Sequence, residues 1–293
     1  MQFTWTHHGE PLAMKRFLTQ HGISMRTIKA IKQGAGDFLV NDQVKTGVIT
    51  INAGDVAGIR LPDEAADETV VVSHQPLQVQ YEDANWLVVD KPAGLTSVPG
   101  PSNREDTLVN RIKGYLVATQ APNQRPHLIT RLDRDTSGLV LVAKHHVAQG
   151  MLTDPKLVDQ LVKTYLAWIE GTLTPASGTI DQPIGRLDDS PRRGVTANGQ
   201  RAITTYKVET ATLAHAVSRV RLQLVTGRTH QIRVHLSALG HPLLGDALYD
   251  GNQTWIKRQA LHAASLQFYD PFAEQTRRFE APLPADLQAL NRQ

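Results

Sequence analysis

The stretch ITRLDRDTSGLVLVAKH, residues 129–145, changes from charged to apolar within a few positions. Its apolar run, Leu139 to Ala143, has the length and composition of a buried β-strand. The residues before Gly138 would ordinarily form an exposed loop. A loop held at the end of a buried strand is also a common place for catalytic side chains. The candidates for chemistry are therefore the four charged residues of this loop, Arg131, Asp133, Arg134 and Asp135.

Further apolar segments on both sides of this stretch predict a sheet. Three of them read as strands, and in the last one apolar and polar residues alternate: WLVVDKPAGL (86–95), KTYLAWIEG (163–171) and SRVRLQLVTG (218–227). In THQIRVHLSALG (229–240) the apolar residues instead have helical spacing, and Gly240 and Pro242 end the helix. Strands interspersed with helices predict an α+β fold.

The first 62 residues predict a separate small α+β domain. In GISMRTIKAIKQGAG (22–36), Ser24 is the expected helix N-cap, Ile23 and Ile28 can form a hydrophobic staple, and Gly34 ends the helix. A hairpin with Asn41-Asp42 at its turn follows, and then two more strands around Gly54-Asp55. The acidic, patternless stretch PDEAADE (62–68) indicates a linker. We therefore predict domains over 1–62 and 72–293, joined by a linker over 63–71.

Composition restricts the possible classes of protein. The chain has 293 residues, 41% of them hydrophobic and 20% charged, which is typical of a soluble globular protein. It has no cysteine, which excludes disulfides, thiolate nucleophiles and zinc–thiolate sites. The N-terminus lacks the apolar core of a signal peptide, and no run is long enough to span a membrane. We expect a cytoplasmic protein without a membrane partner, and nothing in the sequence requires more than a monomer.

The distribution of charge predicts a polyanionic partner. The net charge is +3, and residues 1–62 alone carry seven basic residues against four acidic ones, so the whole surplus lies there. Arg26, Lys29 and Lys32 recur at every third position, which places them along one edge of the predicted helix. Such an edge suits phosphate binding. A solvated helix face with no binding role is the alternative.

Three other kinds of site share short features with the sequence. Asp133-Arg134-Asp135 has the spacing of an aspartyl-phosphate phosphatase motif, but that motif follows its strand, whereas this one precedes it; EDTA would abolish such an activity. Asp135-Thr136-Ser137-Gly138 has the wrong order for an aspartic protease and occurs once. Of the 12 histidines, His230 and His235 are spaced about 140° apart on a helix, and the pairs at 7–8 and 145–146 would face apart on strands. We predict no metal site.

A longer match includes the opening stretch. RLDRDTSGLVLVAK resembles the signature of the RluA-type RNA pseudouridine synthases, His-Arg-Leu-Asp-x-x-Thr-Ser-Gly. Five further blocks resemble that family in the same order: ANWLVVDKPAGL (84–95), KTYLAWIEG (163–171), PIGR (183–186), TGRTHQIRVHLSALGHPLLGDALY (226–249) and ALHAASLQF (260–268). The resemblance covers nearly all of residues 72–280. It departs from the signature at Thr130, which stands where the family has His.

The resemblance implies a fold and an activity. The fold would be the mixed, mostly antiparallel sheet of pseudouridine synthases, and the reaction would turn uridine into pseudouridine within RNA. No atom is gained or lost in that isomerisation, so no cofactor is required. The order of elements over residues 12–61 resembles the small RNA-binding domain named after ribosomal protein S4. The implied partner is structured RNA, with ribosomal RNA favoured and transfer RNA possible. A catalytically inactive RNA-binding or ribosome-assembly factor is the alternative.

The resemblance also implies roles for particular residues. Asp133 would act as an ionised carboxylate, either as a nucleophile or as the base that begins glycal formation, and Arg233 would keep it ionised. Tyr165 would stack on the uracil, and Arg131 would enter the space that a flipped uridine leaves. Lys163 and Leu261 would contribute to substrate binding. Arg134 and Asp135 fall at variable positions of the signature, and Thr136, Ser137 and Gly138 would shape the turn. The polar segment 185–201 is expected to be an exposed loop that could contact RNA phosphate.

Overall fold

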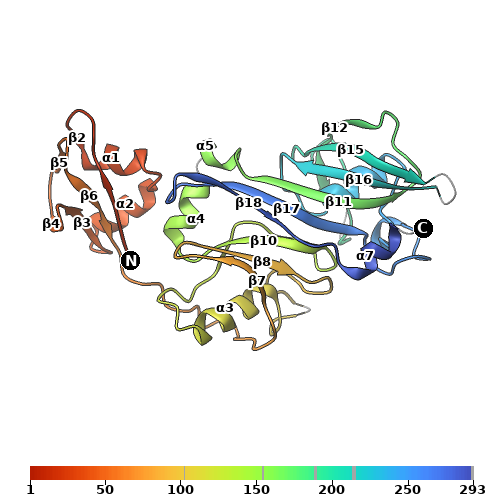
Figure 1. Ribbon diagram of the computed structural model, residues 1–293, viewed down its shortest axis with the longest axis horizontal. Coiled ribbons are helices and arrows are strands. Elements are labelled where there is room, and N and C mark those ends of the chain that lie inside the picture. The colour runs from red at the N-terminus through yellow and green to blue at the C-terminus, as the bar shows by residue number, and fades with distance from the viewer. Residues whose placement is uncertain (102, 154, 188–189, 213–215, 292–293) are drawn as a thin grey trace.

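The protein is an α+β molecule built around one large, mostly antiparallel sheet (Figure 1). The computed structural model describes residues 1–101, 103–153, 155–187, 190–212 and 216–291. In the large sheet the strands follow the order β12-β15-β16-β11-β17-β10-β8-β7, with β18 beside β17 and β9 beside β10. The strand bounds are β7 Gln78–Glu82, β8 Trp86–Lys91, β9 His127–Leu128, β10 Ser137–Ala143, β11 Val162–Glu170, β12 Ser177–Asp181, β15 Ile203–Thr212, β16 Val217–Leu224, β17 Leu261–Asp270 and β18 Gln275–Glu280.

Strand β10 is the apolar run of the opening stretch, and all seven of its residues are buried. It pairs with β8 in antiparallel and with β17 in parallel orientation, so both edges are covered. The parallel pair joins Gly138 to Ala263. Gly138 has φ +111°, and a Cβ atom there would lie 2.3 Å from the backbone oxygen of Ala263. Only glycine suits this position, where β10 begins to pair with β17.

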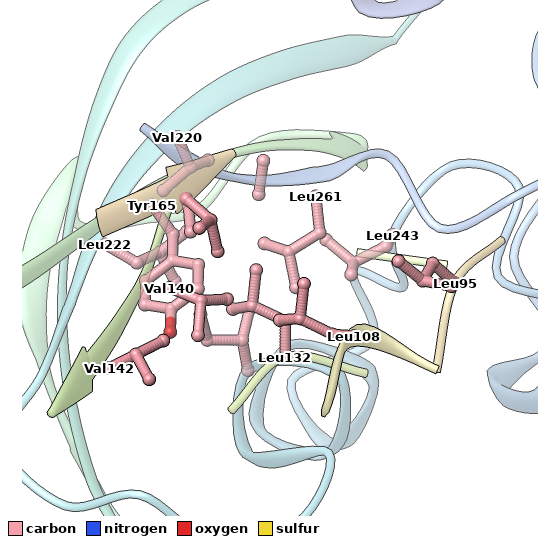
Figure 2. Packing of buried hydrophobic residues seen from close by; sticks show 14 of the residues in the cluster. Leu95, Leu108, Leu132, Val140, Val142, Tyr165, Val220, Leu222, Leu243 and Leu261 are labelled. Carbon is pink, nitrogen blue, oxygen red and sulfur yellow. The ribbon is translucent and has the colours of Figure 1, made fainter. Parts of the chain in front are cut away.

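Apolar side chains fill both faces of the sheet. On one face the side chains of β8, β10 and β11 pack against α3 (Leu108–Ala118) and α6 (Gln231–Ala238), and Figure 2 shows Tyr165 and Leu132 within this cluster. On the other face Trp86 and Leu141 pack with Ala148 and Leu152 of α4 (His146–Leu152). The alternation predicted for β16 is confirmed, since Val220 and Leu222 are fully buried. The short helices α5 (Pro155–Val158) and α7 (Ala285–Leu290) complete the larger part of the chain.

The N-terminal residues form a second, four-stranded antiparallel sheet of order β1-β6-β3-β4. Its strands are β1 Gln2–Thr6, β3 Asp37–Val40, β4 Gln43–Lys45 and β6 Val56–Arg60; β2 Leu12–Ala13 pairs separately with β5 Thr50–Ile51, and the helices are α1 Met14–Gln20 and α2 Met25–Lys32. The predicted capping is confirmed, because the Ser24 hydroxyl accepts a hydrogen bond from the Thr27 amide at 3.1 Å. The predicted tight turn is confirmed by positive φ values at Asn41 and Asp42. Strand β1 was not predicted.

The N-terminal sheet is joined to the rest of the molecule by shared apolar packing. Its hydrophobic cluster includes Val147 and Met151, which belong to α4 (Figure 1). The segment predicted as a linker forms no helix or strand, but it is held by the body of the protein. The carboxylate of Glu64 binds the rings of His127 and His146, and Lys113 donates to the carbonyls of residues 67 and 70. The linker segment therefore follows a fixed path, although the division into domains remains a prediction.

Three predictions of local structure were wrong. Neither histidine pair lies on a strand: His7 and His8 follow the end of β1, and His145 caps the start of α4, accepting from the Ala148 amide. The segment 185–201 is not a simple loop, because β13 (Ile184–Arg186) and β14 (Arg193–Val195) pair within it; its residues 188–189 lie outside the described residues. Ser137 and Gly138 belong to β10 rather than to a turn. No helix in the part of the chain that the structure describes is long and apolar enough to span a membrane.

Candidate active site

The loop that carries Asp133 is held at successive residues by hydrogen bonds to its backbone. The Thr130 hydroxyl accepts from the Leu141 amide at 2.9 Å, which ties the loop to β10. Ser97 donates to the Leu132 carbonyl at 2.6 Å and accepts from the Leu132 amide at 3.1 Å. The Thr136 amide donates to the Asp133 carbonyl at 3.2 Å and closes a turn. Thr130, at the position of the family's histidine, thus has a structural contact of its own.

Two basic side chains, those of Lys91 and Arg258, also hold the backbone of this loop. The Lys91 side chain is fully buried, and its Nζ donates to three carbonyls, those of Pro92, Leu95 and Arg134, at 2.7–2.9 Å. Burial lowers the pKa of Lys91 to about 7, and the nearby carboxylates of Asp135 and Asp133 oppose that shift. Arg258 donates to the Asp135 carbonyl at 3.2 Å and is itself held by Asp286. The loop backbone is therefore fixed before any substrate binds.

Asp133 faces a buried arginine from α6. Arg233 Nη1 donates to Asp133 Oδ2 at 3.2 Å, and Arg233 Nε and Nη2 bind both oxygens of Asp246 at 2.7 and 2.8 Å. Asp246 is only 1% exposed. Burial works against the charge of Arg233, but its hydrogen bonds and the two carboxylates outweigh burial and raise the pKa of Arg233. Asp246 therefore orients the guanidinium, whose remaining nitrogen meets Asp133.

A histidine and a tyrosine lie beside this ion pair. His230 Nε2 is 4.0 Å from Asp133 Oδ2, and His230 Nδ1 is 3.0 Å from the Tyr249 hydroxyl. The ring of Tyr249, in the 3-10 helix η1 (Ala247–Tyr249), lies 4.9 Å from the Arg233 guanidinium carbon, a cation–π contact. Side chains other than Asp133 and Arg233 therefore also contribute to the order of the site.

A pocket opens above Asp133 and extends into a wider cavity of about 470 Å³. Tyr165 and Leu261 line the pocket next to Asp133, and the wider cavity brings in Lys163 from β11. Burial raises the pKa of Tyr165, and the charge of Asp133 adds to that shift, so the phenol stays protonated. Burial lowers the pKa of Lys163. Within the described ranges the structure gives no hydrogen bond to the Tyr165 hydroxyl or the Lys163 amine, so both are available to a ligand.

The structure brings together the residues predicted for catalysis and substrate binding. Asp133, Arg233, Tyr165, Arg131 and Leu261 border one pocket, and Lys163 borders the cavity that continues it. Arg131 is exposed at the rim, and it has no carboxylate partner among the described residues. Arg134 instead pairs with Asp135 on the surface at 2.9 Å, as their variable positions predicted. The roles of the pocket residues toward a substrate remain predictions.

Several residues that hold the site in place were not predicted, among them Lys91, His230, Asp246 and Tyr249. Asp246 and Tyr249 lie in the block GDALY. The resemblance of this block to the family does not say which residues its side chains contact. Lys91 carried one usable signal, since it closes an otherwise mostly apolar strand, after Asp90 and before Pro92, where a buried lysine is unusual. The basic residues Arg26, Lys29 and Lys32 border a separate groove on α2 with Lys15. The described part of the chain holds no group of three or more histidine, aspartate or glutamate side chains placed to bind a metal ion.

Comparison with known proteins defines the family. Residues 85–238 match the family described as RNA pseudouridylate synthase. The chain is 40% identical to YjbO of Bacillus subtilis, named an uncharacterized RNA pseudouridine synthase, over 95% of this chain and 98% of that one. It is 36% identical to ribosomal large subunit pseudouridine synthase D of Xanthomonas campestris, over 87% of this chain and 80% of that one. Among solved structures, human RNA pseudouridylate synthase domain containing 1 has a TM-score of 0.58 and 30% identity, covering 74% of this chain and 88% of that chain.

The chain belongs to the RNA pseudouridylate synthase family, whose members are isomerases. Within that family, the resemblance to the RluA-type enzymes is confirmed by the relatives of Bacillus and Xanthomonas.

Proposed function

We propose that the pocket above Asp133 isomerises a flipped uridine of ribosomal RNA, with Asp133 as the reacting carboxylate. In the isomerisation the bond from the ribose C1′ to N1 of uracil breaks and a bond from C1′ to C5 forms. The proton that C5 loses is balanced by the proton that N1 gains, so no other reactant is needed. The observation that most directly supports this proposal is the pairing of Asp133 with Arg233 at 3.2 Å in a pocket beside Tyr165.

The surroundings of Asp133 support this assignment. A carboxylate next to a nucleobase loses solvation and would tend to become protonated. Arg233 carries a permanent positive charge and is held in place by Asp246, so it favours the ionised carboxylate that begins the reaction. The loop backbone is fixed by Ser97 and Lys91, so little reorganisation is needed when the base enters.

The other pocket residues suit a base that must be flipped and turned. The ring of Tyr165 and the side chain of Leu261 offer a flat and an apolar surface, which tolerate several orientations of uracil. Arg131 stands exposed at the rim, where it would fill the gap in the RNA left by the flipped nucleotide. Lys163 offers an unpaired cation within the cavity for a phosphate or a carbonyl oxygen.

Ribosomal RNA is the proposed substrate, with the N-terminal residues as a capture surface. The relative from Xanthomonas campestris is named for the large ribosomal subunit. Arg26, Lys29 and Lys32 are exposed along one edge of α2, where they could meet RNA phosphates, as the likeness to the S4-type domain suggests. Mapping pseudouridine in cellular RNA with and without the protein would identify the target; sites confined to transfer RNA would refute the ribosomal assignment.

Replacing Asp133 with asparagine tests the catalytic role. We expect Asp133→Asn to lower the rate of pseudouridine formation by roughly 10³-fold or more, because the amide cannot carry the negative charge, while RNA affinity stays near that of the wild type. The measurement is turnover on ribosomal RNA fragments together with a binding titration.

The matched control for that variant is Asp135→Asn in the same turn. Asp135 pairs with the exposed Arg134 and is not among the residues that line the pocket, so its loss should leave the rate within about threefold of the wild type. Full activity in Asp133→Asn would overturn the assignment. A wild-type protein that binds RNA without forming pseudouridine would instead indicate a binding or assembly factor.

A further inference from the structure

His230 adopts a backbone conformation that is uncommon for residues with a Cβ atom. It has φ +58° and ψ +21°, the left-handed region, at the position just before α6. Such a conformation is uncommon for a residue with a Cβ atom and costs free energy that the surrounding structure must offset. The carbonyl of His230 accepts from the Val234 amide at 2.9 Å, and the side chain turns back toward Asp133. The fold therefore holds this imidazole at the catalytic carboxylate in spite of the backbone cost.

The hydrogen bonds of Tyr249 suit one tautomer of His230. The Arg193 amide donates to the Tyr249 hydroxyl oxygen at 2.9 Å. The hydroxyl hydrogen is then free to point at His230 Nδ1, 3.0 Å away. When Nδ1 accepts that hydrogen bond, the proton of a neutral imidazole resides on Nε2. In that tautomer Nε2–H faces Asp133 Oδ2; the 4.0 Å between Nε2 and Oδ2 is too long for a hydrogen bond, so the N–H acts on the carboxylate through its dipole.

Arg233 and His230 approach the same oxygen of Asp133. Arg233 Nη1 lies 3.2 Å from Oδ2, and His230 Nε2 lies 4.0 Å from Oδ2. Oδ1 has no hydrogen-bond or ion-pair partner among the residues that the structure describes. The two oxygens thus differ in surroundings: Oδ2 faces the protein's donors, and Oδ1 is left for the nucleotide in the pocket.

We propose that His230 is a positioning residue for Asp133: as a neutral imidazole oriented by Tyr249, it directs Nε2–H at Oδ2 and so presents Oδ1 to the substrate. This inference rests on the proposed role of Asp133 as the reacting carboxylate. The charged and titratable groups around His230 are Asp133, Arg233, Asp246, Arg193 and Tyr249. Burial is the largest influence on His230 and lowers its pKa, so the ring is neutral near pH 7.

Two amide variants separate a positioning role from a structural one. In His230→Gln the amide nitrogen reaches the place of Nε2 and can still present an N–H to Asp133. In His230→Asn the shorter amide reaches only the place of Nδ1, so contact with Tyr249 is kept and the donor to Asp133 is lost. Asparagine tolerates left-handed backbone better than glutamine does, so the Asn variant should be at least as stable.

We expect the Gln variant to be the more active of the two and the Asn variant to be at least as stable. Turnover, kcat, should fall by roughly 10- to 100-fold in His230→Asn and stay within about threefold in His230→Gln, with KM for RNA little changed in both. The acid limb of the kcat profile should move to higher pH in the Asn variant but not in the Gln variant, because a carboxylate that loses a facing N–H dipole is more easily protonated. Tyr249→Phe, which releases the tautomer, should shift the profile in the same direction by less.

The outcomes distinguish this inference from the proposed function. Equal kcat values for the Gln and Asn variants, or unshifted pH profiles, would overturn the positioning role, and so would a loss of activity that follows stability. Those results would leave Asp133 as the reacting group as long as Asp133→Asn is inactive. Activity in Asp133→Asn would instead remove the function on which the inference rests.

Discussion

Gly138 illustrates how a single residue can set the position of the site. It is the first residue of β10 to pair with both neighbours, Lys91 of β8 and Ala263 of β17. Asp133 lies five residues before it, in the loop that β10 supports. Any side chain at this position would push β10 away from Ala263 and shift the loop with it, because the obstacle is backbone rather than a flexible side chain.

Gly138→Ala should therefore destabilise the protein by more than its dihedral strain. We expect a loss of at least about 3 kcal/mol in the free energy of unfolding, from positive φ together with the clash at 2.3 Å. Gly240→Ala is the matched control, since Gly240 has φ +81° and a Cβ atom added there would meet nothing within 4 Å; it should cost only about 1 kcal/mol. Denaturant unfolding measures both, and equal losses would show that the strand contact tolerates a methyl group.

For single residues, the sequence predicted which side chains meet in the pocket but not which residues hold them there. Asp133 and Arg233 were predicted from motifs, because the residues of a family's blocks recur at fixed places. Asp246 and His230 could not be predicted in the same way, because their contacts depend on how the turn before η1 packs against the start of α6. Packing of that kind leaves no periodic pattern in the sequence.

Helix α2 is the element whose surface most needs an experiment. Its buried edge holds Ile28 and Ile31, and the three basic side chains on its other edge have no carboxylate partner among the described residues. The triple variant Arg26→Gln, Lys29→Gln, Lys32→Gln should weaken RNA binding and reduce the slope of log affinity against log salt by roughly 2, as lost phosphate contacts release fewer counterions.

A charge-matched control separates this effect from net charge alone. Arg125, Lys207 and Arg278 are exposed and lie outside α2, so replacing them with glutamine removes the same formal charge elsewhere; Arg125 and Arg278 each pair with a carboxylate. That control should keep most of the salt slope of the wild type. Identical slopes in the two triple variants would show that α2 has no special part in binding RNA.

Elements with strong local signals were predicted well. The Ser24 cap and the Asn41-Asp42 turn depend on residues within a few positions of each other, so the sequence alone specifies them. Strand β1 and the β13–β14 hairpin were missed because their strands gain stability from partners distant in sequence or from turns without glycine signals. The same holds for His145 and His146, whose helical start depends on a cap that only the structure reveals.

The whole molecule should lose stability in mild acid, in part through His145. Its Nδ1 accepts from the Ala148 amide and its Nε2 contacts Asn85 at 3.0 Å, which suits a neutral ring. Burial lowers the pKa of His145 to about 4, from an unfolded value near 6.5. Between these values the unfolded chain binds a proton that the folded protein does not, so the unfolding free energy falls as pH decreases, by about 3 kcal/mol at pH 4.

His145→Asn isolates this contribution, because asparagine can still cap α4 but does not titrate. The loss of stability between pH 6.5 and pH 4 should be smaller in this variant by about 3 kcal/mol. Burial also lowers the pKa of His262 to about 4, so part of the pH dependence should remain. His8→Asn, at an exposed histidine, is the control and should match the wild type. An unchanged pH dependence in His145→Asn would contradict the prediction.

The shared packing of the N-terminal sheet with α4 has a geometric consequence for substrate choice. Val147 and Met151 fix the sheet, and Glu64 fixes the segment that follows it, so the groove on α2 and the pocket of Asp133 keep a constant separation. An RNA anchored at α2 could then offer to Asp133 only those nucleotides that its own fold places at that distance. The choice of uridine would depend on the three-dimensional spacing between an anchoring phosphate and that uridine. The nucleotide sequence around the uridine would matter little.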